Sequence, residues 1–389
     1  MTQLSRETQL IRWRTRYAHR NPDGKTQLLD EFCEQYDYSR KHAIKLLRNA
    51  LPQPTGQSPS GAPPRYDPIR EIVEQIWQCA EQPCGKRLVA ALPLWLPHYP
   101  KHFNCLLPSQ RQLLGEVSAA TLDRLLVLHR AKARRGLSGT KPGSLLRTQV
   151  PIQGEVWQQD RVGFLEADSV AHCGESLAGD FVWSLTYTDL ACTWTEGRAV
   201  WNKGAARLPR RIGGQAGVLA QTRDVEASLP FALRGFDFDN GGEWLNWHLI
   251  RHLQHRRQPV QITRSRPYHK DDNAHVEQKN WMWPRQLLGY GRLGQERVVA
   301  PINTLYKEVW GPLQNFFLPS MKLQDKWREG SRWVRRHDQP QTAYQRLRGS
   351  RQITRRQRQR LREYYESLDP FALAQQLEQQ LKPILRIAT

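Results

Sequence analysis

The spacing of apolar residues changes near residue 153, and this change divides the chain into parts that fold in different ways. Before it, apolar residues recur at the spacing of a helix. After it, runs rich in β-branched and aromatic residues predict strands at residues 163–174, 180–190 and 193–200. Later runs predict strands at 231–239 and 259–264, with helices between and after them. An α/β core is therefore expected in this part of the chain.

The N-terminal domain is predicted over residues 1–51 as a pair of short helices. Leu28, Leu29 and Phe32 form the apolar stripe of the first helix, and Ser39 is placed to cap the second. This pattern is typical of a helix-turn-helix, whose second helix enters the major groove of DNA. A plain helical hairpin is the alternative.

The remaining boundaries follow from composition. A second helical DNA-binding domain is expected at 69–135, with Ser118 capping its last helix; a plain helical unit is the alternative. Segments rich in Pro, Gly or Ser are predicted linkers, and a basic helical region is expected at the C-terminal end, where Thr354 is placed to cap a helix. The linkers are expected at 52–68 and 136–152. The core is expected at 153–323 and the basic C-terminal region at 324–389.

The positive charge lies in the two ends of the chain. The net charge is +21, yet residues 151–290 carry 16 Lys and Arg against 16 Asp and Glu. Residues 1–150 carry 23 basic against 12 acidic residues, and residues 291–389 carry 19 against 9. Basic arms favour a polyanion such as DNA. We therefore expect the arms to bind DNA and the neutral centre to carry the chemistry.

Composition also bears on the compartment. No apolar run reaches the roughly 20 residues of a membrane-spanning helix, and the polar N-terminus lacks the apolar stretch of a signal peptide. Ordinary buried thiols are expected, with a zinc site as the alternative, because the spacing fits no common zinc finger. We expect a cytoplasmic protein without membrane contact. The residues of that alternative zinc site are Cys79, Cys84, His98, His102 and Cys105.

Three carboxylates are singled out by the predicted elements that carry them. Asp168 lies in the first strand of the core, Asp239 at the end of the fourth and Glu277 in the helix after the fifth. Hard cations prefer oxygen ligands, and a pair of them activates the nucleophile and stabilises the transition state of phosphodiester chemistry. Clustered carboxylates repel one another without metal. The three residues are therefore predicted to be catalytic and to bind two Mg²⁺ or Mn²⁺ ions.

Other acidic residues of the core are expected to be structural. Asp189 ends the second strand as a turn residue, and Asp237 is expected to point to the opposite side from Asp239. Asp271 and Asp272 are expected to cap the next helix, where the positive end of the helix dipole favours a carboxylate.

Four long motifs carry a family resemblance, at residues 163–174, 234–244, 263–281 and 315–323. With 37 residues between Asp239 and Glu277, they resemble the catalytic core of DDE transposases and retroviral integrases. The chain is especially similar to bacterial insertion-sequence transposases. The resemblance implies an RNase H-like integrase core whose catalytic triad is Asp168, Asp239 and Glu277. Many members of that family have a small residue immediately before the second aspartate, where this chain has Phe238. The larger side chain is expected to alter packing near the site.

Basic residues close to these elements are predicted to bind DNA. Some lie on the second N-terminal helix, one lies in the second helical domain, and some surround Glu277 as phosphate clamps. For this last group, salt bridges to neighbouring aspartates are the alternative. The predicted DNA contacts are Arg40, Lys41, Lys45, Arg48, Arg124, Arg264, Arg266, Lys270 and Lys279.

The resemblance implies a transposase that binds the terminal inverted repeats of its mobile element. It would hydrolyse a phosphodiester with bound metal and join the freed 3′-OH to target DNA. Holding two ends implies a homo-oligomer on double-stranded DNA. Two alternatives stay open: a non-catalytic DNA-binding regulator that retains an integrase-like core, and an RNase H-like nuclease for RNA–DNA hybrids or junctions. Metal-dependent cleavage of a duplex that mimics an element end separates the transposase from the regulator.

Overall fold

The computed structural model describes most of the chain and divides it into two compact units, Met1–Asp67 and Pro68–Thr389. The predicted linker 52–68 lies outside the described residues up to residue 64, and the predicted linker 136–152 does so entirely. The described residues are 13–36, 38–48, 65–127, 129, 161–202, 214–238, 244, 247–264, 284–329 and 332–387.

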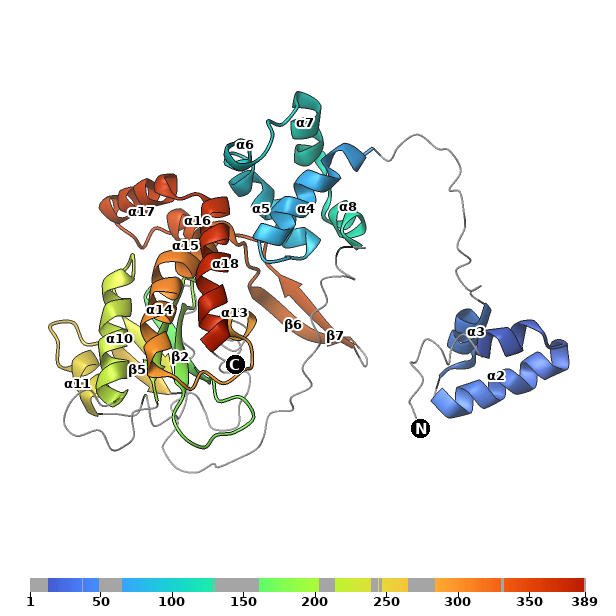
Figure 1. Ribbon diagram of the computed structural model, residues 1–389, viewed down its shortest axis with the longest axis horizontal. Coiled ribbons are helices and arrows are strands. Elements are labelled where there is room, and N and C mark those ends of the chain that lie inside the picture. Colours follow the sequence, from blue (N-terminus) through green and yellow to red (C-terminus); the bar gives the residue numbers. More distant parts are fainter. Residues whose placement is uncertain are drawn as a thin grey trace. The chain divides into compact units, whose positions relative to one another are not determined.

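The first unit contains α2 (Pro22–Tyr36) and α3 (Arg40–Arg48) (Figure 1). Proline fits the first position of α2, where no backbone N–H is needed, and Asn21 Oδ1 accepts a hydrogen bond of 2.9 Å from Gly24 N–H. The apolar stripe expected in the first helix is confirmed, because those side chains are buried. The core of the unit consists of Tyr17, Leu28, Leu29, Phe32, Ala43 and Leu47.

The second unit begins with a helical region that packs against the rest of the unit. The indole of Trp95 donates to Phe317 O at 3.1 Å, and its ring meets that of Phe371 edge to face at 4.9 Å. The sequence suggested a separate domain here, but the buried face around Trp95 joins it to the later helices. The elements are η1 (Asp67–Ile69), α4 (Arg70–Cys79), α5 (Gly85–Trp95), α6 (Tyr99–His102), α7 (Pro108–Glu116) and α8 (Ala119–Leu125).

The described strands of the core form a five-stranded sheet of order β3-β2-β1-β4-β5. β1 pairs antiparallel with β2 and parallel with β4, which in turn pairs parallel with β5. The three strands, helix, strand, helix and strand expected from the sequence are all present. Their bounds are β1 (Phe164–Ala171), β2 (Val182–Asp189), β3 (Thr195–Trp201), α10 (Gly214–Ser228), β4 (Gly235–Phe238), α11 (Trp247–Gln254) and β5 (Gln261–Arg264).

Helices cover both faces of this sheet. Tyr187 on β2 hydrogen-bonds Thr222 of α10 at 3.0 Å, whereas Ser184 on β2 hydrogen-bonds Tyr306 of η4 at 2.8 Å. Strand side chains alternate between faces, so α10 and η4 lie on opposite sides. The elements after β5 are α13 (Gln286–Leu288), η3 (Glu296–Val298), α14 (Val299–Thr304), the π-helix η4 (Leu305–Trp310) and α15 (Gly311–Phe317).

The edge of β3 is closed by two asparagine amides. Asn303 donates to Ala199 O at 3.0 Å and accepts from Ala199 N–H at 2.7 Å. Asn315 does the same with Thr195, at 2.9 Å in each direction. Each amide reproduces the paired donor and acceptor of a neighbouring strand, so this edge does not offer these groups to another chain.

The C-terminal region begins with a two-stranded antiparallel ribbon, which corrects the expectation of a wholly helical region at 324–389. Charged residues occupy positions on both of its faces, so no alternation of apolar and polar residues marked its strands. Thr354 caps α17 as predicted, accepting from Gln357 N–H at 3.2 Å. The elements are β6 (Leu323–Glu329), β7 (Arg332–His337), α16 (Ala343–Gly349), α17 (Arg355–Ser367) and α18 (Pro370–Ile387).

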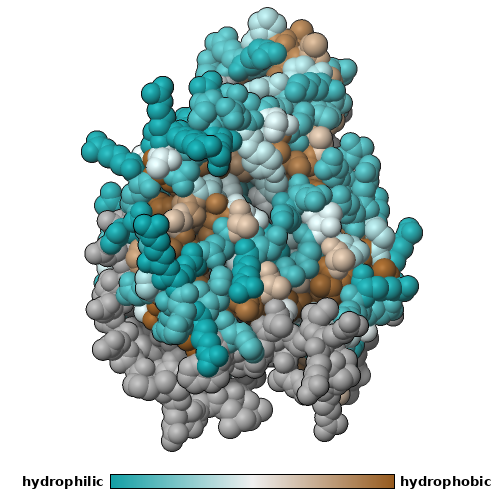
Figure 2. All heavy atoms as spheres, turned by 90° about the vertical axis from the view of Figure 1, so that its left-hand side faces the viewer, coloured by the Kyte–Doolittle hydropathy of each residue, from teal (hydrophilic) through white to brown (hydrophobic). Residues whose placement is uncertain are grey.

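The surface agrees with a folded chain of high charge. On the face turned toward the viewer in Figure 2, hydrophilic residues surround scattered apolar patches. Among the described residues, no helix combines the length and the apolar character that crossing a membrane requires.

Candidate functional site

Asp168 lies in β1, the central strand of the sheet. It pairs with Thr186 of β2, and its side chain is half-buried. Its Oδ1 atom accepts a hydrogen bond of 2.7 Å from the backbone N–H of Ser169. Because Thr186 and Ser184 alternate with Tyr187 on β2, Asp168 lies on the face of the sheet opposite α10.

Two further carboxylates share this face with Asp168. Glu166 precedes it by two residues on β1 and pairs across the ladder with Asp237 of β4. Both are buried, with exposed fractions of 5% and 9%, and Thr263 donates a hydrogen bond of 2.5 Å to Asp237. Asp237 therefore lies on the face of Asp168, since residues two apart or directly paired lie on one face. Its expected direction was stated relative to Asp239, which lies outside the described residues.

The other two predicted catalytic residues, Asp239 and Glu277, lie outside the described residues. β4 ends at Phe238, the residue before Asp239 in the chain, and Phe238 pairs with Ala167, the residue before Asp168. Within the part of the chain that the structure describes, no group of three or more His, Cys, Asp or Glu side chains is placed to hold a metal ion.

The alternative zinc ligands take other partners. His98 Nδ1 and His102 Nε2 face the carboxylate of Asp369 at 3.5 and 3.1 Å. Burial, together with the charges of Glu81 and Glu378, raises the pKa of Cys79 to about 11. A thiol in that state resists forming the thiolate that binds zinc, so these contacts favour structural roles.

The predicted recognition helix α3 presents basic residues to solvent. Lys41 and Lys45 are exposed, and Arg40 forms an exposed ion pair with Asp30 of α2. Arg48 is the last residue of α3, and its side chain lies outside the described part.

The second predicted recognition helix, α8, is short. Ser118 caps it as predicted, accepting from Thr121 N–H at 3.2 Å, and its two leucines, Leu122 and Leu125, are buried. Arg124 is exposed and donates to Thr121 Oγ1 at 3.0 Å. Asp123 accepts from Gly85 N–H at 2.8 Å and so anchors α8 to the start of α5.

The remaining predicted DNA contacts flank Glu277 in the sequence. Arg264 ends β5, and its side chain lies outside the described part. Arg266, Lys270 and Lys279 lie wholly outside the described residues.

Arg292, which the sequence analysis did not single out, fixes the loop after β1. Its guanidinium donates to four carbonyls of the loop and lies 5.2 Å from the ring centroid of Phe181. Gly174 and Gly179 adopt φ angles of +62° and +73° in this loop, a region that favours glycine. The carbonyls belong to Cys173, Ser176, Ala178 and Asp180, at 3.1, 2.8, 2.6 and 3.1 Å.

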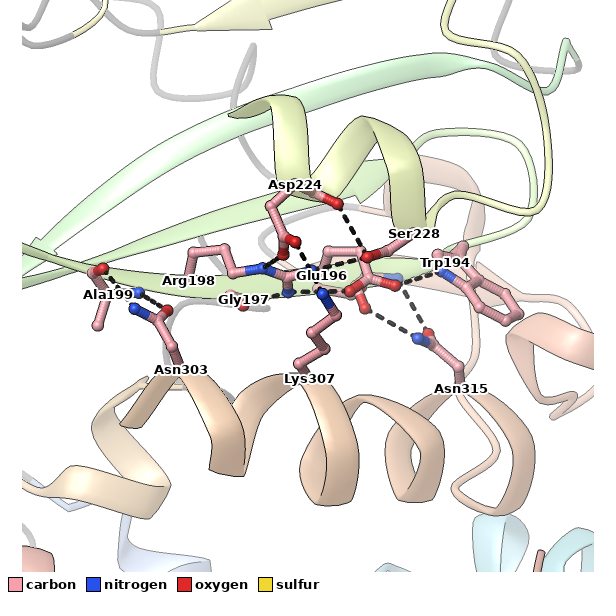
Figure 3. A network of polar contacts seen from close by, with 11 residues as sticks. Trp194, Glu196, Gly197, Arg198, Ala199, Asp224, Ser228, Asn303, Lys307 and Asn315 are labelled. Atoms are coloured by element: carbon pink, nitrogen blue, oxygen red, sulfur yellow. Dashed lines mark hydrogen bonds and ion pairs between the residues drawn. The ribbon is translucent and has the colours of Figure 1, made fainter. Parts of the chain in front are cut away.

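A second group of charged residues lies on the other side of the sheet, between β3 and α10 (Figure 3). Arg198 of β3 is 1% exposed, and it donates to Glu196 at 3.1 Å and to Asp224 of α10 at 2.7 Å. Lys307 of η4 reaches Asp224 at 2.7 Å, and the Trp194 indole reaches Glu196 at 2.9 Å. These ion pairs join β3, α10 and η4.

The titration of these carboxylates reflects their surroundings. Burial raises the pKa of Glu196, against the opposing influence of Arg198 and Trp194. Burial also acts to raise the pKa of Asp224, but hydrogen bonds from Lys307 and Arg198 outweigh it and lower that pKa. Both carboxylates have cationic partners, which is typical of a structural network.

A pocket of about 360 Å³ lies beside this network. Glu196, Glu308 and Lys307 bring charge to its wall, and Trp194 and Tyr364 bring aromatic surface. Asp168 does not line the pocket. The predicted catalytic carboxylate and the pocket therefore belong to different places in the fold.

Comparison with known proteins relates the chain to a bacterial family. No family model matches the sequence. One chain of a cryo-EM structure of a simian T-cell lymphotropic virus intasome in complex with PP2A regulatory subunit B56 gamma matches at 12% identity and a TM-score of 0.24, over 46% of this chain and 55% of that chain. A likeness of that size carries no argument. The chain is, however, 37% identical over 331 residues to the uncharacterized protein y4rM of Sinorhizobium fredii (strain NBRC 101917 / NGR234), which covers 84% of this chain and 90% of that protein. The chain therefore belongs to the same protein family as y4rM.

Proposed function

We propose that the protein is a DNA transposase of the DDE type, which cuts and joins DNA with bound divalent metal. Its central sheet supports this proposal. In the order β3-β2-β1-β4-β5, the first three strands along the chain are antiparallel neighbours and the last two run parallel to β1. This is the arrangement expected of an RNase H-like core, the fold that the motifs imply.

The observation that carries the proposal is the register between β1 and β4. Ala167 pairs with Phe238, so the residues that follow each of them in the chain are Asp168 and Asp239. In parallel strands the carboxyl ends lie at the same edge of the sheet. We propose that these two aspartates converge there and that Glu277 completes the site.

The donor set suits a hard cation. The proposed residues offer only carboxylate oxygens, which Mg²⁺ and Mn²⁺ prefer. Asp168 is half-buried, so a ligand can approach its carboxylate, and Glu166 and Asp237 add negative charge on the same face. When bound, the metal pair would activate water or a 3′-OH and stabilise charge on the phosphorus centre.

The protein's own residues would orient this reaction. The hydrogen bond from Ser169 N–H fixes one oxygen of Asp168. The clamp of Arg292 fixes the loop that follows β1. Exposed Lys41 and Lys45 on α3 would hold the element end through phosphate and base contacts, and basic residues elsewhere would hold the backbone.

A cleavage assay on the full-length chain tests the proposal. The substrate is a labelled duplex that carries the inverted repeat flanking the coding region, and the metal is Mg²⁺, Mn²⁺ or none. We expect nicking at the repeat end only with metal, and loss of nicking in Asp239→Asn and Glu277→Gln. Asp180→Asn is the matched control, because Asp180 is exposed and only its carbonyl is engaged by Arg292. Specific binding without cleavage in any metal would favour the non-catalytic regulator instead.

A further inference from the structure

The ribbon β6–β7 is anchored firmly at its base. Lys322 N–H donates to Asp338 Oδ1 at 2.6 Å, and Asp338 N–H donates to Lys322 O at 2.9 Å. Arg346 forms an ion pair with Asp338 and donates to Ser320 O at 2.8 Å. The Lys322 ammonium also donates to Leu190 O at 2.7 Å. The base of the ribbon is therefore fixed to the core.

Beyond its base, the ribbon extends away from the helices of its unit (Figure 1). Leu323 and Trp327 are both 41% exposed. A two-stranded ribbon is marginally stable in water unless one of its faces is covered. An anchored ribbon on which Leu323 and Trp327 are exposed therefore suggests a surface that a partner covers.

The strand register sorts the charges of the ribbon onto its two faces. Lys326 pairs with Arg335, and Arg328 pairs with Trp333. Alternation then gives a basic face that has no acidic position and a mixed face that balances two acids with two arginines. The basic face comprises positions Leu323, Lys326, Arg328, Trp333, Arg335 and His337, and the mixed face comprises positions Asp325, Trp327, Glu329, Arg332, Val334 and Arg336.

The basic face costs stability in the free protein. Like charges at directly opposed positions, as at Lys326 and Arg335, destabilise an antiparallel pair. On the mixed face, Asp325 opposes Arg336 and Glu329 opposes Arg332, which is the favourable arrangement. A polyanion laid on the basic face would remove the repulsion.

We propose that the basic face of the ribbon binds the phosphate backbone of double-stranded DNA without regard to sequence. The major groove, about 12 Å wide, admits a two-stranded ribbon, and phosphates on its rims meet arginine side chains. The choice of duplex DNA as partner rests on the proposed function. The difference in charge between the two faces follows from the strand register alone. The ribbon would add sequence-independent affinity for DNA to the base contacts proposed for α3.

Neighbouring arginines on opposite faces allow a matched test. Arg335 lies on the basic face and Arg336 on the mixed face, and both are exposed. The affinity of the full-length chain for a random-sequence duplex is measured in EDTA, over a range of salt, for wild type, Arg335→Gln, Arg336→Gln and Arg335→Lys. Far-UV circular dichroism and light scattering check folding and self-association.

We expect Arg335→Gln to reduce the slope of log affinity against log salt by about 0.9, so its loss of affinity is about 3.5 times larger at 50 mM than at 200 mM salt. Arg336→Gln keeps the wild-type slope, and Arg335→Lys restores it because the charge returns. Equal effects of Arg335→Gln and Arg336→Gln would overturn the proposal, as expected if the charges only keep an exposed ribbon soluble. Loss of self-association in Arg335→Gln with an unchanged slope would instead assign the face to a second copy of the chain. This binding assay needs no cleavage. Its result therefore stands whether or not the protein proves to cleave DNA.

Discussion

Two groups of carboxylates in one sheet differ in what surrounds them. On β3 and α10, Glu196 and Asp224 receive cations, from Arg198 and Lys307, in a buried network. On β1 and β4, the N–H of Ser169 donates to Asp168, and the hydroxyl of Thr263 donates to Asp237. The first group has its compensating charge within the protein. For the second group, the proposed function assigns the carboxylates to a metal site.

The comparison teaches that residue type alone does not separate a structural carboxylate from a catalytic one. A buried carboxylate with its own arginine holds elements together, and removal of either partner leaves a charge without compensation. Carboxylates that gather on one face of a sheet, as Glu166, Asp168 and Asp237 do, repel one another, so a bound cation would stabilise them. The two groups should therefore respond in opposite ways to mutation.

The largest expected difference is in activity. Asp168→Asn should reduce cleavage of an element-end duplex at least about a hundredfold, because a metal ligand contributes several kcal/mol to the transition state. Its melting temperature should stay unchanged or rise slightly, because one of three like charges on that face is removed. Rates under single-turnover conditions and thermal unfolding measure both. Wild-type cleavage by Asp168→Asn would remove this residue from the proposed site.

At Arg198, we expect a substitution to reduce stability, whereas at Asp168 it should reduce activity. Arg198→Met should lower the free energy of unfolding by about 3 kcal/mol or more, because Glu196 stays buried without its cation. The double variant with Glu196→Gln should recover part of that loss, since the uncompensated charge is gone. Urea unfolding of the four proteins in this cycle gives the result. A double variant as unstable as Arg198→Met would show that packing, and not charge, dominates at this position.

A smaller effect is expected at the edge of β3. Asn315→Asp cannot donate to Thr195 O, and the loss should be about 1–3 kcal/mol because both groups are buried. Asn303→Asp, at a half-buried position, should cost less. Denaturant unfolding compares the two variants. The same loss at both sites would argue that burial of the amide does not set the cost.

The smallest effect concerns pH. The folded-state pKa of Asp224 lies below its unfolded value, because Lys307 and Arg198 outweigh the opposing influence of burial. Its contribution is therefore fully present above about pH 4 and is lost as pH falls through the lowered pKa. Asp224 is 39% exposed, so the contribution should stay within about 1 kcal/mol. Asp224→Asn should flatten the acid side of the stability profile, and an unchanged profile would contradict this account.

Much of the fold could be predicted from local patterns. The five strands of the sheet follow runs of β-branched and aromatic residues, and the caps Ser118 and Thr354 accept the hydrogen bonds that their positions predict. These features depend on neighbours in the chain, which periodicity and capping chemistry describe.

Other features depended on contacts between distant parts of the chain. Arg198 meets Asp224 only because α10 packs on the sheet, and Arg292 wraps the loop after β1 from more than a hundred residues away. The ribbon β6–β7 lacks an apolar face, so its charged residues resembled a helical region. For the site, Asp168 lies in the strand expected, and Asp237 shares its face. The partners proposed for Asp168 rest on the resemblance of the motifs.

The asparagines on β3 also bear on the order in which the chain is made. Asn303 and Asn315 stand 104 and 120 residues after the backbone groups that they bond. A ribosome releases β3 well before it adds either residue, so the strand waits with an open edge while that stretch is synthesised. During this interval a nascent chain can pair with a neighbour on the same message. Slow translation between β3 and α15 should therefore favour aggregation, and a chain that stops before Asn303 should be less soluble than one that continues past Asn315.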